Sequence, residues 1–159
     1  MQIWTEKAST SVGVFFIPRI GEFMAYNGYL LKMGADVFPL SFVFTNSYSI
    51  TPNRRLDVDS GSNANGVLER NVLDHMPSTI SFQTRPMWND MLGQMMTFIR
   101  NHYSVEKEKK LVLEYYCPDI DDYKTGEFYI PDVTYPINMV DNENNRILYN
   151  SFTLEFIEY

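Results

Sequence analysis

Only one stretch of this sequence repeats its apolar residues with the period of a helix. Between residues 86 and 103 such residues recur at spacings of three and four: Trp88, Met91, Leu92, Met95, Ile99 and Tyr103. Pro86 suits a first helical position, because its missing N–H would have no partner there. The sequence therefore predicts one amphipathic helix over about 86–103, with these residues as its core stripe. Met96 falls outside the stripe, and we expect it to face a partner.

The rest of the chain consists of short apolar or alternating runs separated by Pro, Gly, Asn and Asp. Residues 79–84 alternate, with Ile80 and Phe82 on one face, and residues 146–158 predict one long strand. Further strands are expected at 29–33, 54–58, 67–73, 111–116 and 127–130. Strands, one helix and more strands predict a mostly β (α+β) fold. It would be an antiparallel β-sandwich or a sheet, with the helix packed on it.

Residues 1–23 show no periodicity of either kind over a useful length, and the pattern changes at Met24. One interpretation is that Met24 is the true start and that 1–23 is a translated leader. In support, the Gly21-Glu22 pair can be encoded by a purine-rich sequence like a ribosome-binding site. The other interpretation is an N-terminal arm that packs on a neighbouring subunit. Residues 24–159 are expected to form a single β-rich domain.

A long hairpin is predicted over 57–70. Its centre, 59–66, holds small polar residues and two glycines, which favour turns and offer little to bury. Such a hairpin is long, polar at its tip and unfavourable to leave unpaired. We therefore expect it to contact a neighbouring subunit, through Asp57, Asp59, Asn65, Gly66 and Arg70.

Charge and composition argue against several classes of partner. The formal net charge is −7 and the pI about 4.7, whereas a duplex nucleic-acid binder needs a basic stripe to neutralise phosphates. Docking on an anionic membrane is disfavoured for the same reason. Cys117 is the single cysteine and there are two histidines, so we expect neither a disulfide nor a zinc site. No cofactor is expected, and the chain is predicted to be made in a reducing cytoplasm.

Two groups of carboxylates could support chemistry. The first would form a Ca²⁺ site, since hard cations bind carboxylate oxygens; it comprises Asp119, Asp121, Asp122 and Asp132. Its spacing lacks the glycine and the terminal glutamate of an EF-hand, so a solvated acidic loop is the favoured interpretation. The second would cleave glycosides and comprises Asp57, Asp59 and Glu69. For these, charged strand edges that resist unwanted pairing are favoured.

His75 and His102 could act as general bases. No serine nucleophile motif accompanies them, and no phosphate-binding glycine loop is present. His102 falls at the end of the predicted helix, where a cation complements the helix dipole. We expect structural roles for both histidines, and no catalytic residue.

Several local patterns follow one another along the chain. An Asn65-Gly66 turn precedes Arg70 in the next strand, and a Pro-started amphipathic helix follows. Then come the turn Tyr116-Cys117-Pro118-Asp119, the segment 126–132 with sequence GEFYIPD, and an alternating strand over 150–158. In this order the patterns resemble a family of short, uncharacterised proteins encoded in tail-gene modules of phages and prophages of Gram-positive bacteria. The resemblance covers about 24–159. The chain departs from the family pattern at Arg85-Pro86 and in a longer 104–110 linker.

The resemblance implies a structural component of a bacteriophage tail or baseplate, with a tail-tube-like fold and no catalytic residues. Its partners would be further copies of itself, in a homo-oligomeric ring for which a hexamer is one candidate, and other tail proteins. The protein would be made in the host bacterial cytoplasm and would end in the virion tail. The alternative is a receptor- or carbohydrate-binding β-sandwich module.

Overall fold

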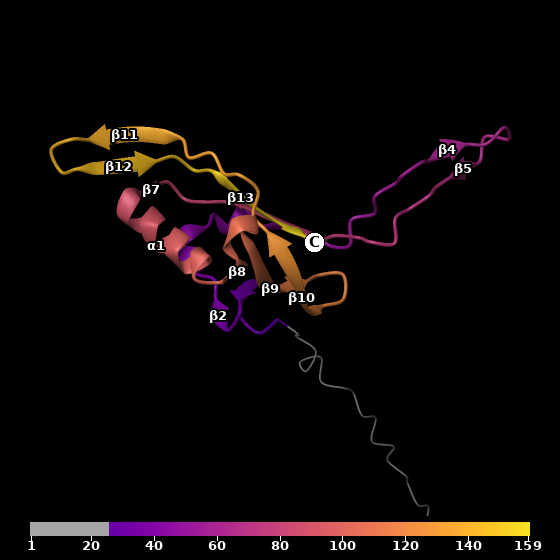
Figure 1. Ribbon diagram of the computed structural model, residues 1–159, viewed down its shortest axis with the longest axis horizontal. Helices are drawn as coiled ribbons and strands as arrows, with labels where there is room; N and C mark the ends of the chain where they lie inside the picture. The colour runs from indigo at the N-terminus through magenta and orange to yellow at the C-terminus, as the bar shows by residue number, and fades with distance from the viewer. Residues whose placement is uncertain (1–25) are drawn as a thin grey trace, which may run out of the picture.

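The computed structural model describes residues 26–159 and is shown in Figure 1. Residues 1–23, for which the sequence left two interpretations, lie outside this range, so both stay predictions. In chain order the elements are β1 (Leu31–Met33), β2 (Asp36–Val37), β3 (Ser49–Thr51), β4 (Gly61–Ser62), β5 (Leu68–Glu69), β6 (Thr79–Gln83), β7 (Met87–Trp88), α1 (Asn89–Arg100), β8 (Tyr103–Val105), β9 (Lys110–Cys117), β10 (Asp122–Tyr129), β11 (Ile137–Asp141), β12 (Arg146–Tyr149) and β13 (Thr153–Glu158).

The prediction of a mostly β fold with one helix is confirmed for the described residues. Eight strands form an antiparallel sheet in the order β2-β1-β9-β10-β13-β6-β3, with β8 also paired to β9. Of the two arrangements expected, a sheet that carries the helix is the one observed. A three-stranded sheet, β11-β12-β7, and a two-stranded ribbon, β4-β5, complete the fold.

The hairpin β9–β10 is the longest pairing in the sheet. On β9 alternate residues are buried, namely Leu111, Leu113, Tyr115 and Cys117. The prediction that the following strand starts at residue 127 is wrong, because β10 pairs with β9 from Asp122 onward. The segment 122–127 lacks an apolar face. Its strand conformation therefore follows from backbone pairing with β9, which periodicity could not reveal.

Both halves of the large sheet contribute to one core. Phe82 of β6 lies at its centre, with its ring 5.6 Å from that of Phe38 and 5.9 Å from that of Phe156. Tyr48 stacks on Phe82 from the other side, at 5.9 Å. From the second half, Tyr115 and Phe128 meet edge to face at 5.6 Å. Burial of such aromatic rings is the main source of stability in a sheet of this size.

The helix is shorter than predicted, because its ends are used by strands. Met87 and Trp88 are extended and pair with β12, and Tyr103 begins β8. Trp88 occupies the N-cap position without a capping side-chain hydrogen bond, and Asp90 lies in the first turn. The prediction that Pro86 starts the helix is therefore wrong, since tertiary strand pairing outweighs the local preference.

The core stripe is correct in its centre and wrong at one edge. Met95 and Ile99 are fully buried, and Leu92 and Tyr103 pack partly buried against the core. Met91, in contrast, is 44% exposed, and Trp88 is only half-buried. Met96 packs partly buried against the core and also lines a pocket at the surface, so whether it faces a partner stays a prediction. Periodicity correctly predicted that Met95 and Ile99 are buried. It did not show which neighbouring positions on the helix surface the rest of the protein covers.

The last predicted strand, 146–158, is two strands in different sheets. The chain breaks at 150–152, where the Phe152 N–H donates to Thr84 Oγ1 at 3.2 Å and the Thr84 N–H donates to Phe152 O at 2.9 Å. Leu148 consequently lies in β12, away from Leu154 and Phe156 of β13. The alternating pattern continued through the break, so it concealed the change of sheet.

The two helix methionines give a matched test of this packing. We expect Met95→Ala to lower the free energy of unfolding by about 2–5 kcal/mol, because it leaves a cavity in the core. Met91→Ala should change it by less than about 0.5 kcal/mol, as is usual for surface positions. Urea denaturation of both variants measures this, and equal losses would contradict the placement of the helix.

Candidate functional site

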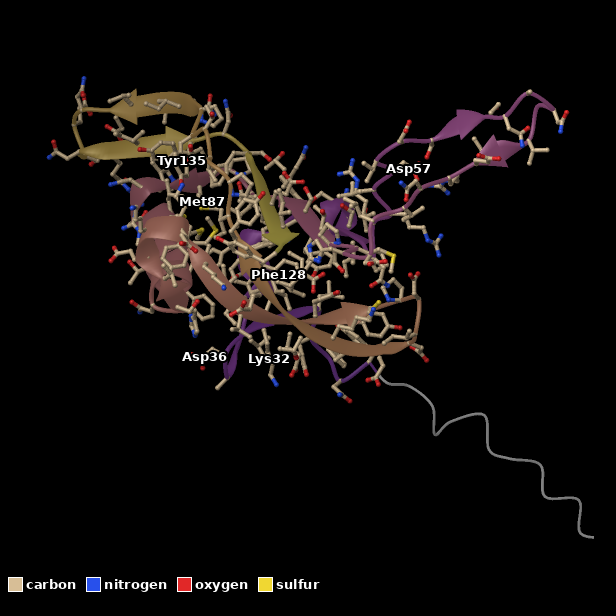
Figure 2. All side chains as sticks on the ribbon, turned by 45° about the vertical axis from the view of Figure 1, so that its right-hand side comes forward. Lys32, Asp36, Asp57, Met87, Phe128 and Tyr135 are labelled. Atoms are coloured by element: carbon tan, nitrogen blue, oxygen red, sulfur yellow. The ribbon has the colours of Figure 1, made fainter. Side chains whose placement is uncertain are left out.

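Two hairpins project from opposite ends of the molecule. The first, here called the arm, comprises residues 54–77 and carries β4 and β5; the second is the β11–β12 hairpin (Figure 1). Figure 2 labels Asp57 where the arm leaves the body and Tyr135 just before β11, at the other end. These projections are the most distinctive surface features among residues 26–159, and the arm contains the residues expected to contact a neighbour.

The arm is a ribbon held mainly by its own backbone. The Val58 N–H donates to Asn71 O and the Leu73 N–H donates to Leu56 O, both at 2.9 Å. Regular strand is confined to β4 and β5 near the tip, with one isolated bridge closer to the body. The predicted strands 54–58 and 67–73 are therefore only partly correct, and pairing extends into the segment expected to be a turn.

A tight turn closes the tip of the arm. Asn63 Oδ1 accepts hydrogen bonds from the N–H groups of Asn65 and Val67, both at 3.0 Å. Gly66 has φ +75°, where a side chain would be strained, and its N–H donates to Asn63 O at 2.9 Å. The predicted Asn65-Gly66 turn is present. The residue that organises it is Asn63, which the sequence analysis missed although Asn is a typical turn residue.

Asp57 and Arg70 bind each other. Arg70 Nη2 lies 2.9 Å from both carboxylate oxygens of Asp57, and Arg70 Nε lies 3.2 Å from Oδ1. Both side chains are exposed, so the pair contributes no more than about 1 kcal/mol. It links the two strands of the arm across their shared face. Asp57 and Arg70 thus hold the arm in shape, and the expectation that they contact a neighbour directly is not tested by this arrangement.

The arm's apolar side chains are the feature that the sequence analysis missed. They lie on both strands and all are exposed, Leu68 most of all at 62%; the set is Val58, Val67, Leu68, Leu73 and Met76. An isolated two-stranded hairpin is marginally stable in water. Apolar residues that give it no internal core indicate a surface that another surface covers. In the sequence, residues 67–73 were interpreted only as the return strand of a hairpin.

The base of the arm is fixed by a buried serine. Ser78 Oγ accepts hydrogen bonds from the Tyr115 hydroxyl at 2.9 Å and from the Asn53 N–H at 3.3 Å. The Ser78 N–H donates to Glu158 Oε2 at 2.7 Å, and the Glu158 N–H donates back to Ser78 O at 2.9 Å. Ser78 and Tyr115 are each 1% exposed, and burial raises the pKa of Tyr115. Both ends of the arm are thereby attached to β9 and β13.

Gly126 leaves room for this arrangement. A Cβ at this position would lie 2.5 Å from Glu158 Oε1 and 3.1 Å from the ring of Phe128. The Glu158 carboxylate can therefore pass over β10 only because residue 126 has no side chain. This glycine is needed for close approach and not for an unusual backbone angle.

The β11–β12 hairpin presents an open sheet edge. Within residues 26–159, β11 pairs only with β12, so no described strand pairs with the backbone groups on its other side. Ile137 is 56% exposed, and Met139 and Val140 are exposed to a similar degree. β11 could not be predicted from the sequence, because the mixed polar and apolar residues 137–141 do not alternate. Long apolar edges are otherwise protected in soluble proteins, by charges, proline or a covering element.

The tip of this hairpin is acidic and rigid. The Asp141 carboxylate accepts hydrogen bonds from the N–H groups of Glu143 and Asn144, both at 3.1 Å, and from the Asn144 side chain at 2.8 Å. The Asn144 side-chain amide, with these backbone donors, lowers the pKa of Asp141. Asp141 consequently stays charged at neutral pH, beside Glu143 on an exposed turn.

The hairpin is attached to the start of the helix. Asn89 Oδ1 accepts a hydrogen bond from the Ile147 N–H at 3.3 Å. The Arg146 guanidinium lies 4.7 Å from the centre of the Trp88 ring, and Arg146 Nη2 lies 3.7 Å from Asp90 Oδ1. Trp88 therefore supports the hairpin rather than the core, which explains its half-buried position.

A shallow pocket of about 260 Å³ lies beside the segment that leads into β11. Its lining combines apolar side chains with two cations and one carboxylate: Met96, Arg100, Tyr103, Glu106, Lys109, Ile130, Val133 and Tyr135. Lys109 Nζ already pairs with Asp132 at 2.7 Å, and burial raises the pKa of Tyr103. No nucleophile and general base meet in this pocket.

Several of the carboxylates and histidines considered for chemistry are engaged in separate structural contacts. Asp121 accepts a hydrogen bond from the Tyr116 hydroxyl at 2.5 Å, whereas Asp132 is paired with Lys109 elsewhere. His102 lies between Phe98 O at 2.8 Å and Asp36 Oδ2 at 3.0 Å, and His75 is exposed on the arm. Within residues 26–159, no three His, Cys, Asp or Glu side chains converge as a metal site would require.

A group of tyrosines on the outer face of β9–β10 bears on the carbohydrate-binding alternative. The Tyr29 hydroxyl donates to Glu114, which with Lys32 lowers the pKa of that carboxylate. The Tyr123 hydroxyl donates to Tyr29 O at 2.8 Å, and the Tyr123 ring lies 4.5 Å from that of Tyr29. The rings meet one another at an angle and do not form a flat stacking platform. Their contacts attach the chain before β1 to the hairpin.

The sequence profile of a family of unknown function, DUF6711, matches residues 24–159. This chain belongs to that family. The resemblance to an uncharacterised family is confirmed to this extent, while the phage origin is a proposal taken up below. No curated protein matches this DUF6711 chain. Within its described residues, no helix has both the length and the apolar character needed to cross a membrane.

The serine at the base of the arm gives a test of how the arm is held. Ser78→Ala should lower the free energy of unfolding by about 1–3 kcal/mol, because the buried Tyr115 hydroxyl loses its acceptor. Tyr115→Phe in the same chain removes that hydroxyl, and the double variant should be no less stable than Ser78→Ala. Thermal and urea denaturation measure the cycle. Additive losses would show that the two side chains act independently.

Proposed function

We propose that this chain is a non-enzymatic structural subunit of a bacteriophage tail or baseplate that assembles as a homo-oligomeric ring. The observation that carries the proposal is the pair of hairpins that project from opposite ends and expose apolar side chains (Figure 1). Surfaces at opposite ends favour head-to-tail contacts, which close into a ring when the rotation between subunits permits it. A ring of six subunits is the first stoichiometry to test.

The energetics support assembly as the purpose of these hairpins. Full burial of a Val, Leu, Ile or Met side chain contributes about 1.5–3 kcal/mol. The arm alone exposes five such residues, and β11 exposes three more: Val58, Val67, Leu68, Leu73, Met76, Ile137, Met139 and Val140. Since association also costs translational and side-chain entropy, only part of this sum would appear as affinity.

The assignment to a phage tail rests on the resemblance given above. The absence of an evident catalytic constellation among the described side chains is compatible with it. A subunit of this kind would contact other tail proteins in addition to its own copies.

Shortening the arm tests assembly directly. Residues 57–72 can be replaced by Asn-Gly, because Leu56 and Leu73 are already hydrogen-bonded across the ribbon and suit a two-residue turn. Light scattering after size exclusion should give a closed oligomer for the full chain and a monomer for the shortened one. The melting temperature should change little, because the arm contributes no residue to the core.

Val112→Ser is the control, since it removes an exposed apolar residue from the outer face of β9. This variant should keep the mass of the full chain. A full chain that remains monomeric at all concentrations would contradict the homo-oligomer, and a shortened chain of unchanged mass would remove the arm from the interface.

The location in a virion has its own test. Antibodies against the purified protein should label the tails of virions released from cells that carry the gene, and leave the heads unlabelled. Immunogold electron microscopy measures this, and pre-absorption of the antibody with the protein is the control. Virions without label, in cells that make the protein, would contradict the assignment.

A further inference from the structure

We propose that the arm of one copy docks along the open edge of β11 in the next copy, with the tip of each hairpin beside the base of the other. This inference rests on the ring proposed above and names the two surfaces that form it. The partner of each arm is therefore a second copy of this chain, and the acceptor is the β11–β12 hairpin.

The arrangement of the hairpins favours contact between copies over contact within one. The arm and the β11–β12 hairpin point away from each other in both views (Figures 1 and 2). Two copies placed end to end therefore bring the arm of one alongside the hairpin of the other, running in opposite directions. The arm is about 30 Å long from residue 56 to its tip, and β11 about 17 Å, so the arm can cover the whole edge.

The two surfaces match in chemistry. Residues 137–140 of β11 carry no charge and no proline, so the edge has none of the usual protection against an added strand. The arm offers unpaired outer edges on both of its strands and an apolar side chain on each, such as Val58 and Leu68. Backbone pairing with apolar contacts beside it is the usual way in which an extended segment joins an exposed sheet edge.

Charge determines which end meets which. The base of the arm carries Arg54 and Arg55, neither of which has an ion-pair partner within residues 26–159. The tip of the β11–β12 hairpin carries the charged Asp141 and Glu143. When the hairpins overlap in opposite directions, this tip lies beside that base. The two arginines then meet the two carboxylates.

Contacts between identical surfaces, arm to arm or β11 to β11, account for fewer of the exposed apolar and charged residues than the arm-to-β11 contact does. Two arms packed against each other would place Arg54 and Arg55 beside the tip residues 63–66, which carry no charge. Two β11 edges paired with each other would leave the arms uncovered. Such contacts are two-fold symmetric and end at a dimer, whereas the arm-to-β11 contact continues from copy to copy.

Charge reversal on each surface tests the pairing. The arm variant is Arg54→Glu/Arg55→Glu, and the hairpin variant is Asn142→Lys/Glu143→Lys, which leaves the Asp141 turn intact. Each variant alone should associate about a hundredfold more weakly than the unaltered chain, because like charges then face each other. A chain that carries all four changes should recover the original mass, and so should an equimolar mixture of the two variants if the ring has an even number of subunits.

Lys107→Glu is the matched control, because it reverses an exposed charge on the short helical turn Glu106–Glu108, which belongs to neither hairpin. It should keep the original mass in light scattering. Melting temperatures of all variants should agree within a few degrees, since none of the changed side chains lies in the core.

Cross-linking distinguishes the docking from symmetric contacts. Leu68→Cys and Ile137→Cys in one chain, treated with a short bis-maleimide, should give a ladder of covalent oligomers. Each single variant should stay monomeric on a denaturing gel, since Cys117 is buried. Dimers from Leu68→Cys alone would indicate arm-to-arm contact, and dimers from Ile137→Cys alone would indicate β11-to-β11 contact; either result overturns the proposal.

Failure of the docking and failure of the ring give different results. An unaltered chain that forms an oligomer insensitive to both charge reversals overturns the docking and leaves the ring in place. An unaltered chain that remains monomeric overturns both. Recovery of the original mass by the fourfold variant, after loss in each double variant, supports the docking.

Discussion

The arrangement of this protein depends on the hydrogen bonds around Ser78. The chain leaves the sheet near Asn53 and returns at Ser78. The Asn53 N–H donates to Ser78 Oγ, and Ser78 is attached in turn to Tyr115 of β9 and Glu158 of β13. The bond between the Tyr115 hydroxyl and Ser78 Oγ is buried, so its loss would leave a polar group without a partner in the core. Because both ends are fixed side by side, the residues between them leave as one ribbon in one direction. An arm without such a base would sample many orientations and present no defined surface.

The second hairpin is positioned by an equivalent device at the other end of the molecule. Strand pairing between β7 and β12 uses the two residues that would otherwise begin the helix, and Arg146 spans Trp88 and Asp90. The helix is shortened as a result, while the hairpin gains a rigid attachment. The later start of the helix thus contributes to the attachment of the β11–β12 hairpin. The local preference of residues 86–88 for a helix start is outweighed by the pairing of β7 with β12, which holds the hairpin in place.

The scarcity of chemistry in the described residues follows from how the polar side chains are used. Glu158, Asp141, Asn63 and Asn89 each satisfy backbone N–H groups at a turn, a hairpin base or a strand end. Such groups hold the backbone in shape and have no free partner with which to act on a substrate. The structural subunit proposed above would need polar residues of this kind to hold its edges in shape. The tyrosines of the outer face are used in the same way, to attach the chain before β1.

The sequence by itself determined the class of fold, the centre of the helix stripe at Met95 and Ile99, the buried face of β6, the presence of β9, and the turn at the tip of the arm. Each depends on local periodicity or on turn-forming residues, which act within a few positions. Only the tertiary structure decided that β10 starts at Asp122, that residues 146–158 divide between two sheets, and that Met91 is exposed while Met96 is partly buried. These features depend on pairing and packing between segments far apart in the chain. β11 also depends on such distant pairing, because it is a strand only through its contact with β12. Its open edge exists because no other described strand pairs there, and local sequence carries no sign of this.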